Sequence, residues 1–166
     1  MFTKMSFQTE RADWIFIVPT TVIWVFSLIV TAWDFVYLQR ATYRFGPLSV
    51  IGLILFLIGQ IIRRVGKRAL GKQYSYGLKP PEMLIKRGLY KWIRHPISLA
   101  MLLYTAGFPL FFSSIYGFMV TLGFLPFTLY RMKIEEKMLI AKFGDEYREY
   151  IKKTKKMIPF IYLKSR

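Results

Sequence analysis

Three apolar stretches without any charged residue limit what this chain can fold into. They cover residues 14–33, 47–62 and 97–130. The first is 20 residues long, which at a rise of ~1.5 Å per residue matches a hydrocarbon core of ~30 Å. Its ends carry Trp14 and Trp33, a residue type that prefers the membrane–water interface. A signal peptide would be shorter and would end in small residues, so we expect a membrane-spanning helix here.

The other two apolar stretches predict three more spans. The stretch 47–62 is shorter and contains one glutamine, but Arg44 and Arg63 flank it and can reach the headgroups with their long side chains. The stretch 97–130 is too long for one helix, and the serine and glycine residues within 113–117 divide it into a helical hairpin. We therefore expect an all-α integral membrane protein with about four transmembrane helices.

Positive charge gathers in two segments of the chain. Of the 25 lysine and arginine residues, ten lie within 63–96 and eleven follow residue 130, whereas the hairpin turn has none. Two spans separate these segments, so both lie on one side of the membrane, and the positive-inside rule makes that side cytoplasmic, together with both termini. With 54% hydrophobic residues the chain is too apolar for a water-soluble domain. The net charge of +16 therefore indicates anionic lipid headgroups as a partner, not nucleic acid.

The 166 residues are short enough for one membrane domain. Residues 1–62 provide two N-terminal spans. Residues 63–166 provide the region where a site is expected, including the hairpin 97–130 and the tail 131–166. The tail has apolar residues at helical spacing between lysines and glutamates, which predicts a cytoplasmic amphipathic helix with a break at Gly144.

Candidate polar residues lie in the middle segment and at the start of the tail. The chain has no cysteine and one histidine, which excludes thiolate nucleophiles and Cys- or His-rich metal clusters, so we expect no metal. Arg94 and His95 precede Pro96, which suits the first turn of a helix. Arg131 and Glu135 are four residues apart and share a helix face. Spacing alone leaves open whether these are interface anchors and a surface ion pair or parts of a ligand site.

Around these residues the sequence resembles the isoprenylcysteine carboxyl methyltransferase and phospholipid methyltransferase family. The segment 84–96, L-I-K-R-G-L-Y-K-W-I-R-H-P, is similar to the family pattern L-V-x-x-G-x-Y-x-x-x-R-H-P. Further similarity to the family's E-E-x-x-L, F-G-x-E-Y-x-x-Y and final proline is found at Glu135 and Glu136, at 143–150 and at Pro159. Two linked motifs in this order are more specific than either alone. The resemblance covers roughly the C-terminal half.

The resemblance implies an S-adenosylmethionine-dependent methyltransferase whose middle segment and tail enclose the cofactor. It implies a cofactor pocket lined by Met83, Leu84, Ile85, Tyr90, His95, Pro96 and Ser98, with Glu135 as a polar contact. It also implies that Arg131 faces a lipophilic or lipidated substrate. The family usually has His and Tyr at the positions where this chain has Glu82 and Ser98, so cofactor orientation and substrate choice can differ from the family pattern.

Methyl transfer from a sulfonium is an in-line displacement that requires alignment and exclusion of water, but no protein nucleophile. A carboxylate acceptor, as in an isoprenylcysteine, would pair with Arg131 through two hydrogen bonds. An amine acceptor, as in a phospholipid, would need a base, for which Glu136 or His95 is the candidate. Two alternatives are a membrane lipid reductase, for which we find no glycine-rich phosphate loop, and a non-catalytic protein that binds anionic lipid.

Overall fold

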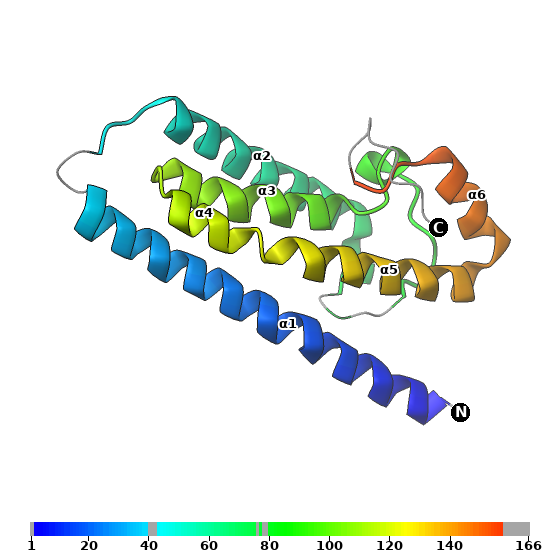
Figure 1. Ribbon diagram of the computed structural model, residues 1–166. Coiled ribbons are helices and arrows are strands. Elements are labelled where there is room, and N and C mark those ends of the chain that lie inside the picture. Colours follow the sequence, from blue (N-terminus) through cyan, green and yellow to red (C-terminus); the bar gives the residue numbers. More distant parts are fainter. Residues whose placement is uncertain (1, 40–42, 76, 78–79, 158–166) are drawn as a thin grey trace.

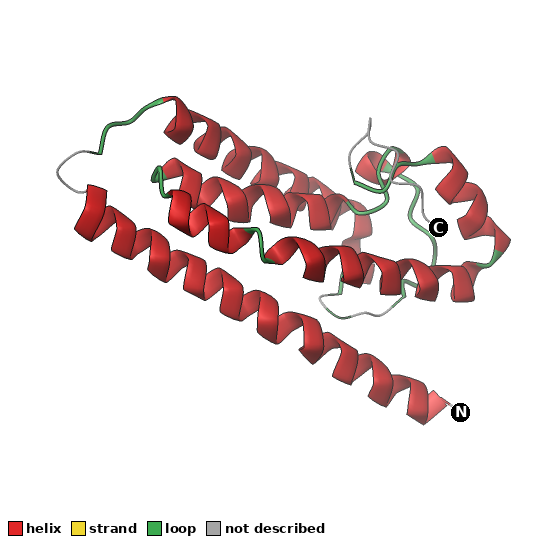
Figure 2. Ribbon diagram, viewed as in Figure 1, coloured by secondary structure: helices red, strands yellow, loops and turns green. Residues whose placement is uncertain are grey.

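The computed structural model describes residues 2–39, 43–75, 77 and 80–157, with side chains described from residue 14 onward. Within these residues all the regular secondary structure is helical, loops connect the helices, and there is no strand (Figure 2). The α-helices are α1 (Phe2–Trp33), α2 (Pro47–Leu70), α3 (Pro96–Phe111), α4 (Ile115–Thr121), α5 (Phe124–Phe143) and α6 (Asp145–Lys153). A π-helical segment, Asp34–Gln39, extends α1, and short 3-10 turns lie at Gly71–Gln73 and Gly88–Lys91. Pro159 of the tail motif lies outside the described residues.

Figure 1 shows helices that run along a common long axis, so the molecule has two ends. The C-terminal end of α1, the start of α2 and the α3–α4 turn lie at one end. The chain after α2, the N-terminus of α1, and α6 lie toward the other, which we call the basic end. Both lysine- and arginine-rich segments meet there, as the charge pattern predicts. The most extensive helix contact joins α2 to α3, followed by the contact of α1 with α4.

Two helical stretches, Trp14–Gln39 and Pro47–Gln73, are long and apolar enough to cross a membrane. Only 17% of the residues in each apolar window are buried inside the protein. Large apolar faces of this kind are rare on water-soluble monomers and suit helices surrounded by lipid. α3 is a shorter apolar helix, and the return arm of the hairpin is divided between α4 and α5.

The hairpin turn predicted within 113–117 is confirmed, because α3 ends at Phe111 and α4 begins at Ile115. Ser114 caps α4: its side chain accepts a hydrogen bond from the backbone N–H of Gly117 (3.1 Å). The capping serine and the glycine that the sequence pattern singled out therefore form the start of the return arm.

The apolar run 97–130 did not predict a second helix break, which lies between α4 and α5. Pro126 explains it, because a proline lacks the N–H and its ring clashes with the carbonyl group four residues earlier, here that of Leu122. The backbone tightens before this point, where Gly123 N donates to Val120 O (3.1 Å). The return arm consequently consists of a short helix and a long one.

α5 continues without interruption from the hairpin into the tail and ends at Phe143. The predicted break at Gly144 is confirmed: its φ of +54° lies in the left-handed region that favours glycine. The turn directs α6 back, so that Tyr147 and Tyr150 pack against Leu139 of α5.

Glycines allow α2 and α3 to approach each other at backbone distance. A Cβ atom on Gly59 would lie 2.8 Å from Tyr104 N, and one on Gly107 would lie 2.5 Å from Phe56 N. Small residues at such contacts are the usual means by which membrane helices pack closely. The contact holds the N-terminus of α3 beside the C-terminal part of α2.

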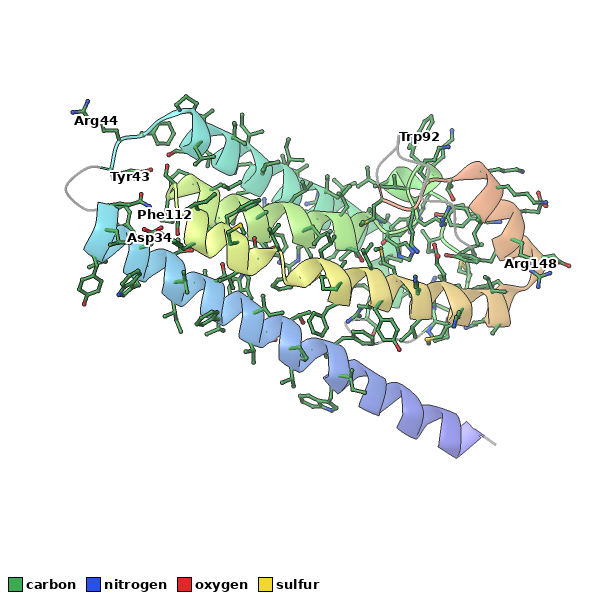
Figure 3. The ribbon with its side chains drawn as sticks, viewed as in Figure 1. Asp34, Tyr43, Arg44, Trp92, Phe112 and Arg148 are labelled. Carbon is green, nitrogen blue, oxygen red and sulfur yellow. The ribbon has the colours of Figure 1, made fainter. Side chains whose placement is uncertain are left out.

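A polar cluster ties the helices together at the end opposite the basic one. Figure 3 shows Asp34 and Tyr43 near Phe112 at this end. Gln39 Nε2 donates to Asp34 Oδ2 (3.0 Å) and to Ser113 O (3.2 Å). Tyr43 Oη donates to the backbone carbonyl of residue 111 (3.0 Å). α1 is thereby anchored to the hairpin turn at a distance from the residues of the motifs.

Candidate active site

The basic end is held together by a short pairing between the loop before α3 and the chain after α6. Arg94 N donates to Lys155 O (2.8 Å), and Lys155 N donates to Trp92 O (2.9 Å). His95 N donates to Lys156 O (3.1 Å). These bonds fix Arg94 and His95 at the start of α3, where both side chains contact α5.

Four charged side chains, Arg94, His95, Glu136 and Lys156, form a buried ion cluster. Glu136 Oε1 lies 3.0 Å from Arg94 Nε and 3.3 Å from His95 Nε2. Its Oε2 lies 3.2 Å from Lys156 Nζ. The side chain of Glu136 is 9% exposed and that of Arg94 is 5% exposed. Burial alone would raise the pKa of Glu136, but the hydrogen bond and charge of His95, together with Arg94 and Lys156, lower it to about 2.

His95 lies between two adjacent glutamates of α5. Its Nδ1 is 3.5 Å from Glu135 Oε2, and its Nε2 faces Glu136. Burial disfavours the charged imidazole, but the hydrogen bonds and charges of Glu135 and Glu136 outweigh it and raise the pKa of His95. Burial also acts to raise the pKa of Glu135, but His95 and then Arg131 lower it. The arrangement favours an imidazolium between two carboxylates.

A cavity of about 410 Å³, the main cavity, opens beside this charged group. Residues from α1, α2, α3, α5, α6 and the loop after α2 line it. Seven of the residues singled out in the sequence meet here: Leu84, Ile85, Tyr90, His95, Ser98, Arg131 and Glu135. Glu135 keeps 43% of its side-chain surface accessible. The main cavity therefore brings together the two motifs that the hairpin separates in the sequence.

Three described residues of the predicted set do not line the main cavity. Met83 is exposed, and Pro96 is buried in the first turn of α3. Glu136 has both carboxylate oxygens engaged in the buried ion cluster. Of the two departures from the family pattern, Ser98 lines the cavity whereas Glu82 is exposed and does not.

A second cavity of about 600 Å³, the side cavity, lies among α1, α2, α3 and the start of α5. Its lining is mostly aromatic and aliphatic, with Trp24, Phe56 and Phe108 among the lining residues. Arg63 and Tyr104 line both cavities, and the Arg63 guanidinium lies over the Tyr104 ring, 5.6 Å from its centroid. The two cavities are thus neighbours that share a wall or an opening.

Sequence reasoning missed Arg63, which it treated as an anchor at the membrane edge. An arginine at the end of an apolar helix carries no signal that separates an anchor from a ligand-binding group. Only the packing of α2 on α3 shows that this side chain lies between two cavities. It also missed that Arg94 and Lys156 join His95 in neutralising Glu136.

Comparisons with known proteins show which sequences this chain resembles. The chain is 32% identical over 118 residues to the protein-S-isoprenylcysteine O-methyltransferase of Saccharomyces cerevisiae, covering 68% of this chain and 49% of that protein. It is 29% identical over 119 residues to the Homo sapiens protein of the same name, covering 69% and 42%. The chain thus spans about half the length of these relatives.

The fold has a counterpart among solved structures. The eukaryotic intramembrane Ras methyltransferase, isoprenylcysteine carboxyl methyltransferase, superimposes with a TM-score of 0.75 at 24% identity, covering 87% of this chain and 53% of that one. The family model described as phospholipid methyltransferase matches residues 48–146. This match contains the R-H-P segment, the glutamate pair and the hairpin between them. The chain whose two motifs enclose the main cavity is therefore a member of the phospholipid methyltransferase family.

Proposed function

We propose that this protein is a membrane methyltransferase that transfers the methyl group of S-adenosylmethionine to the carboxylate of a lipophilic acceptor. The observation that carries the proposal is that a charged cavity at the basic end adjoins an apolar cavity among the helices, with Arg63 lining both. A water-soluble donor and a lipophilic acceptor need such neighbouring sites in order to react. The O-methyltransferases of isoprenylcysteine among its relatives support a prenylated cysteine as the acceptor class.

The main cavity suits S-adenosylmethionine in size and in chemistry. Its volume of about 410 Å³ falls within the range of small-molecule sites. Glu135 offers an accessible carboxylate for the amino group or the ribose hydroxyls, and Leu84, Ile85 and Tyr90 offer apolar surface for the purine. When bound, the cofactor supplies a methyl group activated by its sulfonium. The residues of the chain then need only orient both reactants and exclude water.

The charges around the main cavity favour a carboxylate acceptor over an amine. Arg63 and Arg131 both line it, and a guanidinium can hold a carboxylate through two parallel hydrogen bonds. A carboxylate acceptor would lose no proton on methylation, so these residues would have to hold it in place but not to act as a base. An amine acceptor would need a base, but Glu135 and Glu136 raise the pKa of His95 and so favour its charged form, and Glu136 is neutralised by three cations.

We assign Glu136 a positioning role. Through Arg94 and Lys156 it joins α5 to the loop before α3 and to the chain after α6. Through His95 Nε2 it orients the ring whose other nitrogen faces Glu135 at the cavity wall. A carboxylate with both oxygens engaged in this way is suited to holding the site together.

We also propose four membrane crossings, formed by α1, α2, α3 and the α4–α5 arm as far as Tyr130. The basic end would then face the cytoplasm, with the loop 63–96 and both termini, because both lysine- and arginine-rich segments lie there. This orientation opens the main cavity to a soluble cofactor and leaves the side cavity at the depth of the lipid tails.

A methyl-transfer assay with paired acceptors tests the proposal. Protein in lipid nanodiscs is incubated with methyl-labelled S-adenosylmethionine and either N-acetyl-S-farnesylcysteine or the matched carboxamide, which lacks the carboxylate. We expect label in the acid alone, and we expect alkali to release it as methanol, because esters hydrolyse and N-methyl groups do not. Label in phospholipid that resists alkali, or no transfer to any acceptor, would contradict the carboxylate assignment.

Conservative variants of two arginines separate substrate binding from folding. Arg131→Lys keeps the charge but loses the two-bond geometry, so kcat/KM for the acid should fall roughly 10–100-fold with little change in S-adenosylhomocysteine affinity. The control is Arg148→Lys on α6, whose side chain is 64% exposed and points away from the bundle (Figure 3). Equal kcat/KM values for the two variants would show that Arg131 does not bind the acceptor.

A further inference from the structure

Two tyrosines on consecutive turns of α6 differ in their hydrogen bonding. Tyr147 and Tyr150 both line the main cavity, with ring centroids 5.7 Å apart. Tyr150 Oη donates to Tyr90 O (2.5 Å). Tyr147 is 1% exposed, and its hydroxyl has no hydrogen-bond partner among the residues that the structure describes.

The hydroxyl of Tyr147 is not explained by packing. Its ring belongs to an apolar cluster with Leu139 and Tyr150, against which Leu84 and Phe143 also pack. A phenylalanine would fill the same space, and it would avoid the cost of burying an O–H without a partner. Burial, and then the nearby carboxylate of Glu136, raise the pKa of Tyr147, so the phenol keeps its proton and can donate.

We propose that the Tyr147 hydroxyl donates a hydrogen bond to an acceptor atom of S-adenosylmethionine in the main cavity, which makes α6 part of the cofactor site. This inference rests on the proposed function of that cavity. It assigns a binding role to a residue outside the R-H-P segment and the glutamate pair. The chemistry is complementary, since the ribose, purine and carboxylate groups of the cofactor all carry acceptor atoms.

The test replaces Tyr147 with phenylalanine, which removes only the hydroxyl. The affinity for S-adenosylhomocysteine, measured by calorimetry, should fall roughly 5–30-fold, as expected for one lost hydrogen bond from a buried group. The melting temperature of the ligand-free variant should equal or exceed that of the wild type, because no protein hydrogen bond is lost. In methyl-transfer assays KM for the cofactor should rise while kcat stays close to the wild-type value.

Tyr150→Phe is the matched control on the same helix. It breaks the bond to Tyr90 O, so the melting temperature of the ligand-free protein should fall. A Tyr147→Phe protein that binds S-adenosylhomocysteine as tightly as the wild type, or that loses as much ligand-free stability as Tyr150→Phe, overturns the inference and leaves the proposed function standing. A wild-type protein that binds no S-adenosylhomocysteine overturns both.

Discussion

Replacing Glu136 with glutamine removes one negative charge from the buried ion cluster and nearly preserves the shape of the side chain. Lowering the pKa of Glu136 from 4.5 to about 2 corresponds to roughly 3 kcal/mol of stability at neutral pH. Breaking a buried ion pair by removing one partner costs roughly 3–5 kcal/mol, because the remaining charges stay buried. The two values agree, and they predict a melting temperature roughly 6–12 °C below that of the wild type at pH 7.

The pH dependence gives this prediction a second, independent readout. Because the folded-state pKa of Glu136 is lower than the unfolded value, its stabilisation is present above about pH 4.5 and is lost as the pH falls toward 2. The melting curves of wild type and Glu136→Gln, followed by tryptophan fluorescence in detergent, should therefore converge as the pH falls through this range.

Glu146→Gln on α6 is the control for removing a negative charge. Glu146 pairs with Lys86 at 2.7 Å, but the two side chains are 56% and 45% exposed, so the pair should contribute little. We expect a change of at most roughly 2 °C for this variant. If Glu136→Gln melts within the same small range, the buried ion cluster does not hold the basic end together.

Two further predictions concern His95 and the α2–α3 contact. The pKa of His95 is raised, so its contribution to stability should be complete below about pH 6.5 and should be lost as the pH rises through the folded-state pKa. Because the chain has one histidine, an NMR titration of labelled imidazole measures this folded-state pKa directly. A titration midpoint at or below 6.5 would contradict the prediction. Gly59→Ala places a Cβ 2.8 Å from Tyr104 N and should lower stability by roughly 1–3 kcal/mol. Gly46→Ala is the control and should not lower stability, because its Cβ would lie 3.8 Å from the nearest atom. Equal melting temperatures of the two glycine variants would count against the close approach of α2 and α3.

Much of the architecture follows from local signals in the sequence. Uncharged runs predict the long helices, serine and glycine within 113–117 predict the hairpin turn, and Gly144 predicts the end of α5. These features depend on residues close together in the chain, such as the cap at Ser114. The break before α5 was missed because Pro126 lies inside an apolar run, where hydropathy hides its effect on the backbone.

The site could be predicted only in part, because its decisive contacts join distant segments. Glu135 and Glu136 are neighbours in the sequence, and their order does not reveal that one lines the main cavity while the other is buried among three cations. The helix rotation between them, about 100°, decides this, and it depends on how α5 packs. Lys156 carries no motif of its own, and its role appears only when the chain after α6 returns to the loop before α3.

The return of the chain after α6 has a consequence for biosynthesis. Glu136 is made early in the tail, but its partner Lys156 and the carbonyl of Thr154 that binds Arg94 are made about twenty residues later. A nascent chain that has reached only α6 therefore has the Arg94–Glu136 pair, but it lacks Lys156, which pairs with the second carboxylate oxygen of Glu136, and the Thr154 carbonyl that accepts a hydrogen bond from Arg94. The basic end can become rigid only after the ribosome has added these last residues, so a product truncated within α6 should insert into the membrane yet remain a substrate for proteolysis.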